Sequence, residues 1–310
     1  MRVPRAKLGL VFSTMPPEVP TWPHKGFDYA GRVRQLRSIV REHLPDVEFS
    51  ELVASRPQEF DEAKLGDVGG YAVFLLGIWN GVPRRVVETG KPVLLVDDLY
   101  GGSGEFLETL AWAARSGYRV AGVASSNPAD VARALRVRAA VDMLARSRLI
   151  VVREGEEGFE KLRELVRERV GTDLVLVKPS ELVEEYERAD GGEAERVAER
   201  WIERALELAE PPRGEVVKSA RLYLAMRRLL ERYGAQGITI DCLGLFYGGK
   251  LPAYPCLGYA ELLDSGLVGA CEADVDSALT QMLISYATGR PGFISDPVID
   301  RGSGCIVYAH

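Results

Sequence analysis

Two acidic residues in the C-terminal part of the sequence have the types and spacing of a divalent-metal site. Glu272 follows the small and apolar segment 268–271, a setting in which an unpaired carboxylate would be costly. Asp296 stands directly before Pro297, after a stretch long enough for one helix to run out and the chain to return. Carboxylate oxygens, with an imidazole added, suit Mn²⁺ or Mg²⁺. The pair therefore predicts a metal site, although an Asp-Pro turn also explains Asp296 taken alone.

The segment between the two acids is predicted to be an amphipathic helix. Its apolar residues recur at helical spacing over 275–286, and Gly289 marks its end. Asp274 and Asp276 lie in its first turn, where acids suit the positive end of the helix and can cap it. Capping thus explains these two acids but not Glu272, which precedes the helix.

Histidine is scarce, and the three histidines differ in what they can contribute. His43 falls in the last turn of a predicted helix, where a cation complements the helix dipole, so a structural role is favoured. His24 lies in a Pro-rich loop and is expected to be solvated. His310 closes the apolar segment CIVYAH, where a polar strand end can face a site. A place at a functional site and a structural role are equal alternatives for it.

The glycine-rich segment DDLYGGSGEFL (97–107) follows a predicted strand and opens a predicted helix, where backbone N–H groups can meet anions. Its glycines match neither GxGxxG nor the P-loop. A tight turn with a helix start is favoured, with binding of a sugar hydroxyl or a phosphate as the alternative. A nucleotide-dependent oxidoreductase using this loop is disfavoured, because no acidic residue stands at the ribose-binding spacing.

Four cysteines, Cys242, Cys256, Cys271 and Cys305, lie in the last quarter of the chain without a CxxC pair. They are too sparse for a disulfide scaffold, and their spacing matches no structural zinc module. The favoured interpretation is reduced, mostly buried thiols.

Short apolar strands alternate with helical patterns along most of the chain, which predicts an α/β fold. Such alternation is typical of parallel sheets covered by helices on both faces. Predicted strands cover 7–14, 47–54, 71–79, 92–98, 118–125, 148–152, 173–178 and 237–242. Predicted helices cover 32–44, 104–117, 130–147, 159–170 and 216–234, and the stretch 243–259 is expected to be rich in loops.

The length of 310 residues favours two domains, with a small third one possible. We expect two doubly wound, Rossmann-like (flavodoxin-like) domains: an N-terminal domain over 1–145 and a middle domain over 146–287, which carries Glu272. Residues 288–310, with Asp296, are expected to start a third, β-rich C-terminal domain that is truncated.

The charge balance excludes several classes of partner. With 39 Lys and Arg against 45 Asp and Glu, the formal charge of −6 provides no general positive field for nucleic acid or an anionic membrane. The longest apolar runs are too short to span a bilayer, and the N-terminus lacks a clear cleavage site. A cytoplasmic protein is therefore expected.

Around Glu272 and Asp296 the sequence resembles the L-fucose isomerase and L-arabinose isomerase superfamily. The matching stretches are PCLGYAELLDSGLVGACEADVDSALTQML (255–283) and TGRPGFISDP (288–297). In that family an ACEGD-like segment supplies a metal-binding Glu, and an acid after a TGxP-like turn supplies the second ligand. Ala273 stands here where the family has Gly. The segment from 171 to 242 also resembles the middle domain, and the likeness is faint before residue 140.

The resemblance implies a metal-dependent interconversion of aldose and ketose sugars through a cis-enediol, an intramolecular oxidation and reduction. Mn²⁺, or another divalent cation such as Mg²⁺ or Co²⁺, would be held by Glu272 and Asp296, which would also carry the proton between C1 and C2. Family members continue into a C-terminal β domain that supplies a further metal-binding His. The resemblance thus implies that this chain alone has an incomplete site, unless His310 takes that position. It also implies a homo-oligomer.

The alternative to an isomerase is a non-catalytic carbohydrate-binding or regulatory protein on the same doubly wound domains, because a fold does not determine a function. The two hypotheses differ over metal. An isomerase acting on an unphosphorylated pentose or deoxyhexose needs the cation at Glu272 and Asp296, whereas a binding protein keeps its sugar affinity without it.

Overall fold

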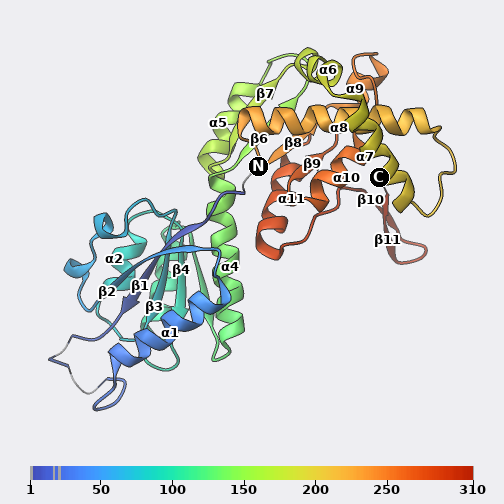
Figure 1. Ribbon diagram of the computed structural model, residues 1–310. Helices are drawn as coiled ribbons and strands as arrows, with labels where there is room; N and C mark the ends of the chain where they lie inside the picture. Colours follow the sequence, from blue (N-terminus) through green and yellow to red (C-terminus); the bar gives the residue numbers. More distant parts are fainter. Residues whose placement is uncertain (1–2, 17, 20–21, 310) are drawn as a thin grey trace. The chain divides into compact units, whose positions relative to one another are not determined.

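The computed structural model describes residues 3–16, 18–19 and 22–309 and contains two parallel sheets flanked by helices and one antiparallel ribbon (Figure 1). The predicted α/β class with two Rossmann-like sheets is confirmed. By its contacts the chain divides into two compact units, Arg5–Met143 and a second unit that begins at Leu144. The first parallel sheet belongs to the former unit and the second to the latter.

The first sheet has five parallel strands in the order β2-β1-β3-β4-β5. Successive residues of β1 pack into apolar cores on the two faces of the sheet. Leu10 and Phe12 pack with residues of α1 and α4, whereas Val11 packs with residues of α2 and α3. A sheet covered on both faces requires apolar residues at successive positions, which explains the apolar runs in the sequence. The strands are β1 (Lys7–Ser13), β2 (Glu48–Ala54), β3 (Tyr71–Leu75), β4 (Val93–Asp97) and β5 (Val120–Ala124), and the helices are α1 (Tyr29–His43), α2 (Val82–Val87), α3 (Ser103–Arg115) and α4 (Pro128–Ala145), with 3₁₀ turns at Pro57–Glu59 and Glu62–Leu65.

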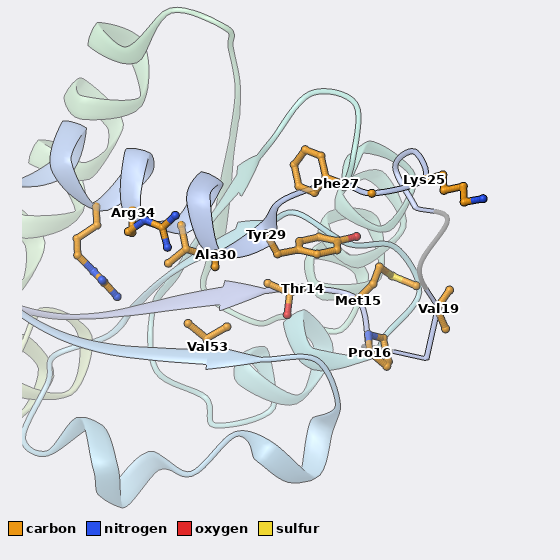
Figure 2. A pocket seen from close by; sticks show the side chains of 13 residues that line it. Thr14, Met15, Pro16, Val19, Lys25, Phe27, Tyr29, Ala30, Arg34 and Val53 are labelled. Carbon is orange, nitrogen blue, oxygen red and sulfur yellow. The ribbon is translucent and has the colours of Figure 1, made fainter.

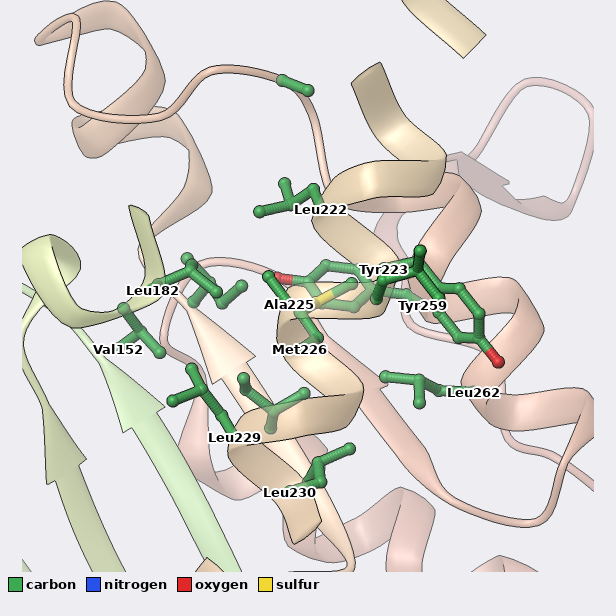
Figure 3. Packing of buried hydrophobic residues seen from close by; sticks show 14 of the residues in the cluster. Val152, Leu182, Leu222, Tyr223, Ala225, Met226, Leu229, Leu230, Tyr259 and Leu262 are labelled. Atoms are coloured by element: carbon green, nitrogen blue, oxygen red, sulfur yellow. The ribbon is translucent and has the colours of Figure 1, made fainter. Parts of the chain in front are cut away.

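The second sheet has four parallel strands in the order β7-β6-β8-β9. Its largest apolar cluster lies under α8, where Figure 3 shows Tyr223, Met226 and Leu229 beside Tyr259 and Leu262 of α10. The strands are β6 (Arg148–Val152), β7 (Asp173–Val177), β8 (Gly237–Ile240) and β9 (Val268–Ala270), and the helices are α5 (Phe159–Arg169), α6 (Pro179–Arg188), α7 (Gly191–Arg204), α8 (Arg213–Tyr233), α9 (Cys242–Tyr247), α10 (Cys256–Asp264) and α11 (Val275–Thr288).

The prediction of a loop-rich stretch over 243–259 is wrong, because these residues include α9 and the start of α10. The carboxylate of Asp241 caps α9 by accepting the backbone N–H of Gly244 at 3.1 Å. Helix α10 packs so closely on α8 that a Cβ at Gly258 would lie 2.4 Å from Cε of Met226. Glycine in this helix is therefore a packing requirement, although in the sequence it resembles a loop signal.

The helix predicted between the two acids is confirmed as α11. Asp274 caps it by accepting the backbone N–H of Ser277 at 2.9 Å, and Gly289 ends it in a left-handed conformation with φ of 68°. After α11 the chain forms an antiparallel ribbon of β10 (Asp296–Asp300) and β11 (Cys305–Ala309), in which all residues of β10 are exposed. In the described part of the chain, no helix combines the length and apolarity needed to cross a membrane.

Candidate functional site

The residues of the second unit that could bind a ligand or take part in a reaction lie at the carboxyl edge of its sheet. Arg153 follows β6, Asp241 and Cys242 follow β8, and Cys271 and Glu272 follow β9. The strand order reverses between β6 and β8, since β7 lies on one side of β6 and β8 on the other. Open parallel sheets bind their ligands outside the carboxyl ends of the strands, near such a reversal. The topology therefore favours this edge as a site.

Glu272 and Ala273 form an unusual turn directly after β9. Their φ values are 65° and 52°, in the left-handed region that L-residues rarely adopt. The surrounding backbone fixes the turn: the N–H of Ala273 donates to the carbonyl of Ile240 at 3.0 Å, and the carbonyl of Cys271 accepts the Thr239 hydroxyl at 3.2 Å. Such conformations cost about 1–3 kcal/mol each and are concentrated at functional sites.

The side chain of Glu272 is exposed, so the expectation that it lies in an apolar setting is wrong. The apolar residues before it belong to β9, which is buried and ends at Ala270, and the turn carries Glu272 out of the sheet. Its carboxylate is therefore hydrated and does not require neutralisation by a partner. The case for a function at Glu272 rests on its position and on the backbone conformation of its turn.

Asp296 is the first residue of β10, where it pairs with Ala309 across the ribbon, and it is also exposed. Among the described residues, no hydrogen bond or ion pair joins Asp296 to Glu272. Their sharing of one ion thus stays a prediction. His310, the third predicted ligand, lies outside the described residues.

The donor chemistry of Glu272 and Asp296 fits a hard divalent cation, since both offer exposed carboxylate oxygens. The described residues contain no group of three or more His, Cys, Asp or Glu side chains placed to hold a metal ion. A cation bound by these two residues would need further ligands from water, from a substrate or from residues beyond those described.

Three cysteines near this edge, Cys242, Cys256 and Cys271, also affect one another's pKa, which the sequence interpretation did not predict. Two of the four cysteines, Cys242 and Cys271, are buried as expected, whereas Cys256 and Cys305 are exposed. The prediction of mostly buried thiols is therefore only half right.

Hydrogen bonding separates the proton affinities of the two buried thiols. The Cys271 thiol lowers the pKa of Cys242 by donating to its sulfur; burial opposes this effect, and the backbone N–H of Glu272 adds to it. The hydrogen bonds of Cys271 to Cys242 and Cys256 raise the pKa of Cys271 itself, because they use its proton. Cys242 is thus the more readily ionised of the pair.

The glycine-rich loop of the first unit is a tight turn that starts α3, as favoured by the sequence. A Cβ at Gly102 would lie 2.1 Å from the carbonyl oxygen of Leu75, and one at Gly101 would lie 2.5 Å from that of Leu76. These glycines are therefore explained by the close approach of the loop to the end of β3, without a ligand.

A cavity of about 870 Å³ lies at the carboxyl end of β1 in the first unit (Figure 2). Thr14, Phe27, Tyr29 and Val53 are among its walls. The Tyr29 hydroxyl donates to the carbonyl of Trp22, and burial raises the pKa of Tyr29 to about 12. The described lining residues include no carboxylate, so this cavity fits a small organic molecule better than a cation.

Comparison of the chain with protein-family models gives no match, and comparison with curated protein sequences gives none either.

Proposed function

We propose that the protein is a metal-dependent aldose–ketose isomerase that acts on an unphosphorylated pentose or deoxyhexose, the activity implied by its resemblance to the L-fucose and L-arabinose isomerase superfamily. One observation carries the proposal: the exposed Glu272 occupies a left-handed turn at the carboxyl edge of a doubly wound sheet. Left-handed conformations of residues other than glycine are costly and are concentrated at functional sites, which supports a role for this acid.

The reaction requires a proton to move between C1 and C2 of the sugar. In the proposal, a cation held by Glu272 and Asp296 would, when bound, polarise the oxygens on these two carbons. One of the two carboxylates accepts the proton from one carbon and returns it to the other, as a general base and then a general acid. The hydrogen bonds on either side of Glu272 would hold the backbone of its turn during this transfer.

A second candidate is a sugar-binding protein without catalysis, and the cavity of the first unit favours it. Its volume of about 870 Å³ is ample for a monosaccharide, and its lining holds aromatic rings, on which sugars can stack, but no acid. Such a protein would bind sugars in the presence of a chelator.

The experiment is an assay of the chain against a panel of aldoses with Mn²⁺, following ketose formation and solvent-hydrogen exchange at C2. Glu272→Gln and Asp296→Asn should abolish both signals, whereas Asp276→Asn, which changes a nearby exposed acid in the first turn of α11, should retain them. Sugar binding that survives a chelator, with no ketose and no exchange on any aldose, would instead support the binding protein.

A further inference from the structure

The cavity of the first unit lies between helix α1 and the edge strand β2 (Figure 2). Ala30 and Val33 of α1 line it on one side, and Val53 of β2 lines it on the other. Its volume of about 870 Å³ is within the range of sites for organic ligands, about 300–1,000 Å³. The space between these two elements can therefore hold an organic molecule on an apolar surface.

The aromatic wall of the cavity is held in place by contacts within the protein. The rings of Phe27 and Tyr29 meet edge to face, with their centroids 4.8 Å apart. The Tyr29 hydroxyl donates to the carbonyl of Trp22, and the indole Nε1 of Trp22 donates to the carbonyl of Gly101 at 2.7 Å. Because these contacts form without a ligand, binding would cost little conformational freedom at this wall.

The charged side chains among the described lining residues are all cationic. Lys25, Arg34 and Arg37 line the cavity, and no described Asp or Glu does. Arg34 and Arg37 are three positions apart on α1, so their side chains lie on one face of the helix. Like charges in a concave site with apolar walls strengthen the local field. The lining therefore favours a ligand with negative charge.

The acids beside these arginines do not cancel their charge. Glu51 forms ion pairs with both Arg37 and Arg41, so two guanidinium groups share one carboxylate. Arg34 lies 3.7 Å from the carboxylate of Asp28, but the two side chains are 68% and 70% exposed, and ion pairs of this kind are weak. Positive charge thus remains at the α1 side of the cavity.

The two ends of the cavity differ in character. Figure 2 shows Arg34 and Val53 toward one end and Lys25 at the other, with Thr14 and Tyr29 between them. A guanidinium group can hold a carboxylate, a sulfonate or a phosphate through paired N–H donors. An anionic group at the arginine end would leave the rest of a ligand beside the aromatic ring of Tyr29.

We propose that this cavity binds an organic anion with an apolar body. Arg34 and Arg37 hold the anionic group, and the apolar body packs against Tyr29 and Val53. A neutral sugar would use the aromatic rings but not the cations, so the charge of the ligand separates this proposal from the sugar-binding alternative. The proposal concerns binding in the first unit and does not depend on isomerase activity at Glu272.

The test uses two probes that share one ring system. Anilinonaphthalene sulfonate carries an anionic group, and phenylnaphthylamine lacks it. In fluorescence titrations of the whole chain at low salt, the sulfonate should bind at least about tenfold more tightly, the gain expected from one charge-assisted hydrogen bond. Arg34→Gln and Arg37→Gln should each weaken sulfonate binding by about tenfold and leave phenylnaphthylamine binding unchanged.

Arg41→Gln is the matched control for the charge. It removes a guanidinium group from the same helix and from the same acid, Glu51, but Arg41 does not line the cavity. Sulfonate binding should therefore be nearly unchanged, with circular dichroism as the check on folding. The proposal is overturned if the two probes bind the wild type equally well, or if Arg41→Gln weakens sulfonate binding as much as Arg37→Gln.

A second pair of variants tests the place of binding without removing an arginine. Val53 is 48% exposed, so Val53→Asp and Val53→Asn should both fold, and they differ only in charge. Val53→Asp puts a carboxylate into the cavity and should weaken sulfonate binding far more than Val53→Asn. Equal binding by the two variants would show that the sulfonate binds elsewhere on the chain and would overturn the proposal.

Discussion

The carboxyl edges of the two parallel sheets hold acidic residues in opposite environments. At the first edge, Asp97 is buried and accepts the Ser103 hydroxyl at 2.8 Å, and Asp98 accepts Nε of Arg32 at 3.0 Å. At the second edge, Glu272 is exposed on a left-handed turn.

The first edge also contains Glu105, which is buried and accepts the backbone N–H of Gly81 at 3.0 Å. The acids there have partners within their own unit and stabilise loops. Glu272 has an exposed carboxylate and lies in a left-handed turn that is fixed by hydrogen bonds of the neighbouring backbone. The two edges therefore differ in both the exposure and the backbone conformation of their acids.

The largest effect is expected at Glu272. If it transfers the proton, Glu272→Gln should lower kcat by about 10²–10⁴-fold, the usual contribution of a general base. Steady-state kinetics with Mn²⁺ would measure this, and the thermal midpoint should be nearly unchanged because the side chain is exposed. A variant that keeps wild-type kcat would remove Glu272 from the mechanism and with it the contrast between the two edges.

At the first edge, the largest effect should be on stability. Gly102→Ala places a methyl group 2.1 Å from the carbonyl oxygen of Leu75, and we expect a loss of about 3 kcal/mol of unfolding free energy in urea denaturation. Gly214→Ala in the first turn of α8 is the matched control, because its Cβ would meet nothing within 4 Å. It should be neutral or slightly stabilising. Similar losses in both variants would contradict the packing explanation.

The strain at the second edge can be released by substitution. Ala273 has φ of 52°, so Ala273→Gly should stabilise the protein by about 1 kcal/mol, since glycine adopts this conformation without a steric penalty. Chemical denaturation measures the gain. A loss of stability would show that the turn is not strained in solution.

The smallest effect concerns the pH dependence of the first edge. Burial raises the pKa of Glu105, although backbone N–H groups, that of Gly81 first, oppose the rise. The folded state then holds the proton more tightly than the unfolded state, so its contribution to stability is complete below the unfolded pKa. This contribution is lost as pH rises through the folded value.

Glu105→Gln removes this titration. Relative to the wild type, the variant should gain stability as pH rises from below the ordinary glutamate pKa to neutrality. Urea denaturation at a series of pH values measures the difference. A difference that is constant with pH would mean that Glu105 does not titrate differently on folding.

Most of the fold could be predicted from the sequence, because buried parallel strands and amphipathic helices have clear patterns. The strand at 148–152 has the predicted bounds, and α11 has the predicted cap at Asp274 and end at Gly289. The strand predicted over 71–79 ends at Leu75, since its apolar run continues into a turn. Periodicity does not distinguish a buried turn from a buried strand.

The candidate site was less predictable. The residues before Glu272 are buried as their types indicate. The positive φ values of Glu272 and Ala273 could not be predicted, because neither residue type favours this conformation. The effect of Cys242 and Cys256 on the pKa of Cys271 depends on how β8 aligns with β9 and on how α10 packs against them. Cys242 closes the strand predicted over 237–242, but β9 before Cys271 was not predicted as a strand, so the sequence analysis did not place the two cysteines at one edge.

The β10–β11 ribbon has a consequence for handling the protein. Its apolar side chains include Ile299 and Tyr308, with exposed fractions of 71% and 63%, and a two-stranded ribbon has little buried area to hold its shape. Its outer backbone groups are open to pairing with any passing strand. In concentrated solution the protein should therefore associate through this ribbon before the two sheets unfold. Its solubility is then a separate property from its thermal stability.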